Sequence, residues 1–144
     1  MIKSGLTFSG IDKEAYIKSL ALVAMADGIL TEEEKSLYES RMGDILVHPN
    51  LRDKYRRFLS GHFTTADVII GNVNKRTLLY ALRDSIMMAK IDGVVHEAEL
   101  KRVNIIAEKA GIGEAKIEEM EKWVDEGIKW MTEGNNLVRL PLDD

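Results

Sequence analysis

Carboxylate side chains recur in two short stretches of this 144-residue chain, in each case around an Asp-Gly pair. The first stretch covers residues 26–34 (ADGILTEEE), and the second covers residues 91–99 (IDGVVHEAE). A glutamate follows the aspartate by seven residues in both stretches. Carboxylate oxygens bind divalent cations, so a divalent cation is the cofactor that such residues can hold. The candidate metal ligands are Asp27, Glu34, Asp92 and Glu99.

An EF-hand is excluded as the form of this site. The EF-hand calcium loop needs oxygen ligands at its first and third positions, in addition to its invariant glycine and final glutamate. With Gly28 or Gly93 at the place of that glycine, those positions hold side chains that cannot bind a hard cation: Val23, Met25, Met88 and Lys90.

The same acidic residues also have a structural explanation. Gly28 can adopt a left-handed conformation that ends a helix, and Thr31 with Glu34 has the spacing of a capping box at the start of the next helix. An aspartate beside glycine readily forms an Asx-turn. Asp27 and Asp92 nevertheless follow helix C-termini, where a negative charge costs ~0.3–1 kcal/mol, and a bound cation would relieve that repulsion. The structural, metal-binding and partner-binding interpretations all remain open at this point.

The elements that must position these residues are helices. The chain contains only two prolines, and it lacks the alternating β-branched runs that are typical of strands. Apolar periodicity and capping signals predict an all-α fold, a compact bundle of about seven helices. These helices are expected at about 12–26, 31–45, 49–59, 64–70, 75–91, 96–110 and 114–132.

The two Asp-Gly pairs are 65 residues apart, which places the first two helices in register with the fifth and sixth. An internal pseudo-two-fold repeat of helix–turn–helix units is the expected arrangement. The first and fifth helices are apolar on nearly all sides and are therefore expected inside the bundle. One domain over residues 1–144 is expected, with a mobile lead-in at 1–11 and a tail at 134–144 that is mobile or laid over the surface.

Composition narrows the functional classes. The net charge of -4 and the pI of 5.5 argue against nucleic-acid binding, and the absence of cysteine excludes disulfides and thiolate metal sites. No signal peptide or membrane-spanning run is present, so a cytoplasmic protein without direct membrane insertion is expected. The three histidines lack metal-ligand spacing, and no phosphate loop or catalytic triad is present, so no catalytic residue is assigned and a non-enzyme is expected. Trp123 and Trp130, one heptad apart, are candidate anchors for a protein partner.

Residues 24–34 (AMADGILTEEE) and 89–99 (AKIDGVVHEAE) resemble the signature of the TerB-like family, the tellurite-resistance domain also found ahead of J-domains in some co-chaperones. The resemblance covers roughly residues 12–112. It implies a seven-helix bundle and a metal-chelating or ion-sensing role for Asp27, Glu34, Asp92 and Glu99. Two departures from the pattern are His96, at the place of Thr31, and Ala98, at the place of an acid.

Two functions are therefore expected. The first is a non-catalytic TerB-like accessory or sensor domain, linked to stress or tellurite resistance, that acts through partner or divalent-ion binding at the duplicated acidic turns. The second is a purely structural protein–protein interaction module that uses the last helix and the C-terminal face, with the acidic turns only capping helices.

Overall fold

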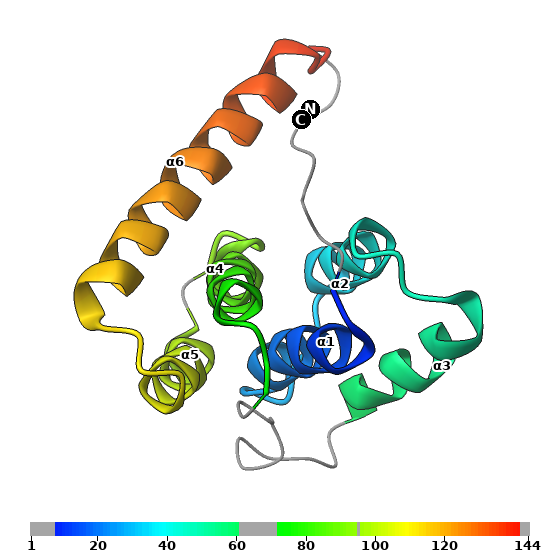
Figure 1. Cartoon of the computed structure of the whole chain (residues 1–144). Helices are drawn as coiled ribbons and strands as arrows, with labels where there is room; N and C mark the ends of the chain where they lie inside the picture. Colours follow the sequence, from blue (N-terminus) through cyan, green and yellow to red (C-terminus); the bar gives the residue numbers. More distant parts are fainter. Residues whose placement is uncertain (1–7, 61–71, 95, 142–144) are drawn as a thin grey trace.

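The computed structural model describes residues 8–60, 72–94 and 96–141, and these residues are predominantly helical without any strand (Figure 1). The α-helices are α1 (Gly10–Ala24), α2 (Glu32–Asp44), α3 (Pro49–Arg57), α4 (Lys75–Lys90), α5 (Glu97–Lys109) and α6 (Glu114–Leu137), and a single 3₁₀ turn, η1 (Phe58–Ser60), follows α3. The all-α class is confirmed. Among the described residues, no helix combines the length and the apolar character needed to cross a membrane.

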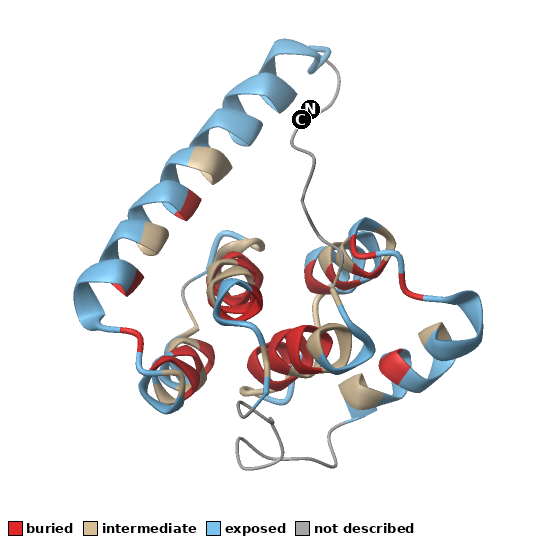
Figure 2. Ribbon diagram, viewed as in Figure 1, coloured by how far each residue is buried: buried red, intermediate tan, exposed pale blue. Residues whose placement is uncertain are grey.

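Helices α1 and α4 form the centre of the bundle, and their mutual contact is the most extensive between any two helices (Figures 1 and 2). Nine residues of α1 and ten of α4 are buried, which confirms the expectation that helices with apolar residues on nearly all sides lie inside. Both core clusters contain residues of α1 and α4; one of them extends to α2 and α3, and the other extends to α5 and α6. The two acidic turns thus follow directly after the C-terminal ends of the two central helices.

Most helix boundaries lie close to those expected from the sequence. Asn74 caps α4 with its side chain, and Pro49 occupies the first turn of α3. The helix expected over residues 64–70 lies outside the described residues.

The first and last helices differ from the expected bounds. Helix α1 begins two residues earlier than expected, because the Ser9 side chain accepts a hydrogen bond from the Asp12 backbone amide and caps it. Helix α6 continues through Gly134 to Leu137, past the expected end near Thr132. A helical glycine costs only about 1 kcal/mol relative to alanine, which is too little to end a 24-residue helix.

The two turns that carry the acidic residues have the same local structure. Gly28 and Gly93 have φ angles of +76° and +81°, in the left-handed region that favours glycine. Each glycine donates its backbone amide to a carbonyl three residues earlier, at 3.1 Å and 3.0 Å. Both turns therefore reverse the chain in the same way between a central helix and the following outer helix.

Candidate functional site

Asp27 and Asp92 each close an Asx-turn with one carboxylate oxygen. Oδ1 of Asp27 accepts from the amide of Ile29 at 2.9 Å, and Oδ1 of Asp92 accepts from the amide of Val94 at 3.0 Å. The Asx-turn expected from the Asp-Gly pairs is therefore present twice. The second oxygen of each aspartate is left to interact outside its own turn.

His96 joins the two turns. Its Nε2 lies 2.7 Å from Oδ2 of Asp92, and its Nδ1 lies 3.1 Å from Oδ2 of Asp27, so the imidazole stands between the two aspartates. The hydrogen bond to Asp92 raises the pKa of His96, and the charges of Asp92 and Asp27 raise it further. Burial alone would raise the pKa of Asp92, but the hydrogen bonds from His96 and the Val94 amide outweigh burial and lower it. The imidazole of His96 therefore links the two acidic turns, and the two aspartates favour its protonated form.

Glu34 belongs to a complete capping box at the start of α2. Its Oε1 accepts from the amide and the hydroxyl of Thr31, and its own amide donates to the Thr31 hydroxyl at 3.2 Å. The sequence prediction of this box is confirmed. The side chain is only 1% exposed, however, and its second oxygen, Oε2, accepts no hydrogen bond from the described part of the chain.

Glu99 occupies the equivalent position at the start of α5, but it does not cap the helix. His96 stands where Thr31 stands in the first turn, and it makes no side-chain cap. Glu99 is 0% exposed, and neither of its oxygens accepts a hydrogen bond from a donor in the described residues. Its carboxyl group instead lies within hydrogen-bonding reach of Glu34. Burial, the contact with Glu34 and the charges of Glu34, Asp27 and Asp92 together raise the pKa of Glu99 to about 10.

Three residues from both turns therefore offer ligand atoms at one place. One atom each from Asp27, His96 and Glu99 lies within 4.8 Å of the others. Two further acids contact members of this group: Asp92 contacts His96, and Glu34 contacts Glu99. The side chains of Asp27 and His96 are each 21% exposed, so the group is buried at Glu99 and reaches solvent at the other two residues.

All four acids assigned from the sequence are thus near one another, but His96 is not among the ligands predicted from the sequence. Its spacing from Asp92 was the available signal. Residues four apart on one turn can interact directly, and His96 follows Asp92 by four residues. From the sequence, this histidine was interpreted only as a departure from the family pattern, at the place of Thr31.

A second polar cluster lies between α1, α2 and α4. The Tyr16 hydroxyl donates to Oδ2 of Asp84, Arg41 Nε lies 3.5 Å from the same oxygen, and Arg83 Nε lies 3.0 Å from Oδ1. Burial and the negative charge of Asp84 raise the pKa of Tyr16. Because Asp84 is 2% exposed and paired with both arginines and the tyrosine, this cluster is a structural network between helices. Only Nε of Arg41 lies at ion-pair distance without making a hydrogen bond in the described part of the chain.

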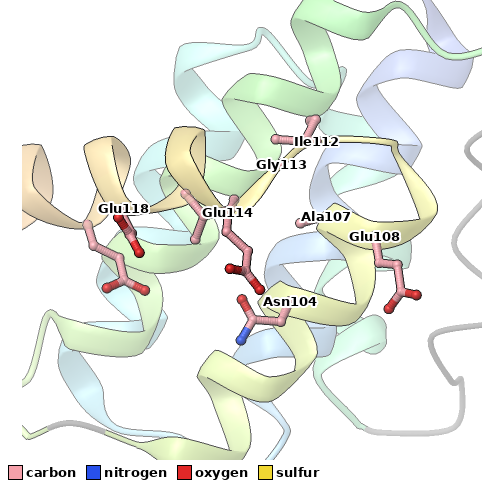
Figure 3. A pocket seen from close by; sticks show the side chains of 9 residues that line it. Asn104, Ala107, Glu108, Ile112, Gly113, Glu114 and Glu118 are labelled. Carbon is pink, nitrogen blue, oxygen red and sulfur yellow. The ribbon is translucent and has the colours of Figure 1, made fainter.

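A cavity lies elsewhere, between α5 and α6 (Figure 3). It has a volume of about 630 Å³ and an apolar floor formed by Ala107, Ile112 and Ile117. Glu108, Glu114 and Glu118 line it, as Figure 3 shows from close by, and all three are exposed to solvent. Exposed glutamates are stable in water without a ligand, so this cavity does not indicate a binding function by itself.

The two tryptophans assigned to partner binding lie on α6. Trp123 is 50% exposed, and its ring is covered on one side by the guanidinium of Arg83, at 5.0 Å from the ring centroid. Trp130 is 75% exposed. Neither residue is part of the acidic group.

No protein-family model, curated protein or solved structure matches this chain. The functional assignment therefore rests on the geometry of the two turns. The feature that distinguishes them from ordinary helix connections is the buried Glu34–Glu99 pair beside Asp27 and His96.

Proposed function

We propose that this protein binds a divalent cation between its two acidic turns. The observation that carries the proposal is the Glu99 carboxyl group, which is fully buried, receives no hydrogen bond from any donor in the described residues, and faces Glu34 and Asp27. A buried carboxylate without a partner costs several kcal/mol in an apolar environment, so either a proton or a cation must neutralise it.

The residues present fit a divalent cation. Asp27, His96 and Glu99 supply two carboxylates and an imidazole, which is a donor set suited to zinc, iron or manganese. Calcium and magnesium prefer oxygen ligands alone and fit this set less well. Asp92 holds Nε2 of His96, so it orients the imidazole in the way that outer carboxylates orient metal-binding histidines.

The bound ion would act by linking the two halves of the bundle. Asp27 lies in the turn between α1 and α2, whereas His96 and Glu99 lie at the start of α5, after the turn that ends α4. An ion held by all three residues fixes these two helix pairs relative to each other. Without the ion, a proton on the Glu34–Glu99 pair takes over part of its charge, and the raised pKa of His96 favours a positive imidazole between the two aspartates.

In this proposal the protein is a non-catalytic, cytoplasmic sensor or accessory domain of the TerB-like kind, linked to stress or tellurite resistance. The repeated sequence signature and the equal backbone geometry of the two turns support it. The proposal includes the seventh helix over residues 64–70 and the pseudo-two-fold relation between the two helix pairs. A second role, as a protein–protein interaction module, is supported by the exposure of Trp123 and Trp130 on α6.

Calorimetric titration of the metal-free protein with zinc, manganese, calcium and magnesium tests the proposal. We expect saturable binding of zinc or manganese and a rise in melting temperature at the same ion concentrations. Absence of heat and of any melting shift at millimolar ion would rule out the site.

Glu99→Gln is the most informative variant. The amide can donate to Glu34 and keeps the buried contact, but it cannot replace the anionic ligand, so we expect a folded protein with affinity at least about tenfold weaker. Glu97→Gln is the matched control, because Glu97 is exposed and lies two residues away on the same helix. Equal affinity in Glu99→Gln and wild type would contradict the assignment of this ligand.

A further inference from the structure

The C-terminal half of α6 lies outside the bundle. Figure 1 shows the helix passing along α4 and then extending beyond the other helices, and Figure 2 shows that its far half is exposed all round. Every residue from Lys129 to Pro141 is exposed. The exposed residues include large apolar side chains that water normally disfavours: Trp130, Met131, Leu137 and Val138.

This half of the helix lacks the packing that stabilises most protein helices. Isolated helices shorter than about 12–15 residues are marginal in water, and the exposed helical segment from Lys129 to Leu137 is shorter than that. Gly134 weakens it further, since a glycine within a helix costs about 1 kcal/mol relative to alanine. A contact with another molecule would supply the missing burial.

Along the exposed face, large apolar residues alternate regularly with glycines. Trp123, Gly127, Trp130, Gly134 and Leu137 follow one another at steps of four, three, four and three residues, which is the spacing of a coiled-coil seam. Within the described structure nothing lies within 4 Å of a Cβ placed at Gly127 or Gly134, so packing inside the chain does not require either glycine. The two glycines thus leave open spaces that alternate with the bulky side chains of the seam.

We propose that α6 pairs antiparallel with α6 of a second copy of this chain, so that each tryptophan of one copy fills the space above a glycine of the other. In an antiparallel pair, facing residues have numbers with a constant sum. A sum of 257 matches Trp123 with Gly134, and Gly127 with Trp130, in both directions at once. The same register places Leu137 over Met120, which is half-buried at the edge of the bundle.

The surface is large enough for a stable dimer. Trp123, Trp130, Met131, Leu137 and Val138 are between 39% and 86% exposed. Together they present on the order of 700 Å² on one copy, close to the ~800 Å² that each partner contributes to a standard interface. A parallel pair would instead oppose tryptophan to tryptophan and glycine to glycine, which leaves both clashes and voids. The complementarity therefore selects a two-fold, antiparallel arrangement.

Charge does not drive this association. Glu119, Glu126 and Glu133 lie along one edge of the seam, and an antiparallel pair brings the same edge of both helices together. Because like charges repel and salt screens them, the dimer should become tighter as the salt concentration rises. Association through opposite charges would show the reverse dependence.

Sedimentation equilibrium of the full chain tests the proposal, with Gly127→Leu as the main variant. We expect a wild-type dimer that strengthens with salt. A Cβ at position 127 meets nothing within 4 Å in the monomer, and leucine has a better helix propensity than glycine, yet a leucine there blocks the site for Trp130 of the second copy. We therefore expect a folded protein with unchanged or higher melting temperature and a dimer dissociation constant at least about tenfold larger. A monomeric wild type, dimerisation that weakens with salt, or a Gly127→Leu variant that dimerises normally would each overturn the proposal.

The register has its own test. Exchanging the two residues, Gly127→Trp together with Trp130→Gly, restores a tryptophan opposite a glycine in the proposed register, so this double variant should dimerise again. The chain has no cysteine, so a spin label on Lys116→Cys is unique. Antiparallel pairing about the 128/129 midpoint separates the two labels by roughly 37 Å along the helix axis. A parallel pair would hold them roughly 10 Å apart, and that result would overturn the proposed arrangement.

Discussion

The carboxyl groups of Glu34 and Glu99 face each other in the interior, although the two residues belong to different helices and are 1% and 0% exposed. One oxygen of Glu34 accepts the hydrogen bond from the Thr31 amide, whereas neither oxygen of Glu99 accepts a hydrogen bond from the described residues. Two buried carboxylates within hydrogen-bonding reach of each other cannot both be ionised without a cation between them. The pair therefore responds to two ligands, a proton and a metal ion, and each would displace the other.

In the absence of metal, the free energy of unfolding should fall as the pH rises. The pKa of Glu99 is raised from 4.5 to about 10, so the folded protein holds a proton that the unfolded chain has lost over this range. That proton contributes full stability below pH 4.5 and progressively less as the pH approaches 10, by up to about 1.4 kcal/mol per pH unit. His96 acts in the same direction, since its pKa is also raised.

Urea unfolding of wild type and Glu99→Gln at several pH values between roughly 6 and 9 measures this dependence. These pH values lie between the unfolded pKa of Glu99, 4.5, and its folded pKa of about 10. The glutamine variant should be the more stable protein at pH 9 and should show a flatter profile. Parallel pH profiles for the two proteins would mean that Glu99 does not carry the proton.

The imidazole of His96 should titrate above its ordinary pKa of 6.5 in the metal-free protein. The cause is its position between Oδ2 of Asp92 and Oδ2 of Asp27. Nuclear magnetic resonance of the imidazole gives the midpoint directly. Asp92→Asn should lower it, because that change removes the carboxylate whose hydrogen bond and charge raise the pKa of His96. An unchanged His96 midpoint in Asp92→Asn would contradict the bridging role.

Removal of the Tyr16 hydroxyl should destabilise the protein without affecting cation binding. Tyr16→Phe keeps the buried ring but leaves Asp84 without one of its donors, at a cost of about 1–3 kcal/mol. Denaturant unfolding measures the loss, and ion titration of the same variant provides the control. A loss of ion affinity at unchanged stability would show that the Tyr16–Asp84 cluster is not purely structural.

The left-handed turn at Gly28 can be tested against a helical glycine. Gly28→Ala meets no atom within 4 Å, so its effect isolates the backbone conformation at φ +76°, which costs about 1–2 kcal/mol for a residue with a Cβ. Gly43 also has open space around it but lies within α2, so Gly43→Ala should stabilise the protein by about 0.5–1 kcal/mol. Thermal or urea unfolding gives both values. A stabilising Gly28→Ala would refute the left-handed turn.

The fold class and most helices could be predicted because local signals and burial agree. The Thr31–Glu34 capping box, Asn74 and Pro49 mark helix starts through contacts within a few residues, and the structure contains all three. The end of α6 was predicted wrongly for the same reason. Local propensity at Gly134 suggests a stop, but a single glycine does not outweigh the continuing helix.

The site could be predicted only as a list of acids. Which acid is buried and which is paired depends on how the two turns pack against each other. The spacing of residues within each turn does not predict that packing. Glu34 and Glu99 have equivalent positions in sequence, yet only Glu34 is a helix cap, because Thr31 provides a hydroxyl and His96 does not. The bridge from His96 to Asp27 joins residues 69 positions apart, so it required the tertiary structure.

Anomalous diffraction from crystals of the full chain grown with zinc tests the central claim most directly. The account predicts one strong peak between the two turns, at about 2.0–2.2 Å from a nitrogen of His96 and from carboxylate oxygens of Asp27 and Glu99. The peak should be absent in crystals of Glu99→Gln and present in crystals of Glu97→Gln. A wild-type crystal at saturating zinc with no peak at this position, and Glu34 and Glu99 still in contact, would contradict the account.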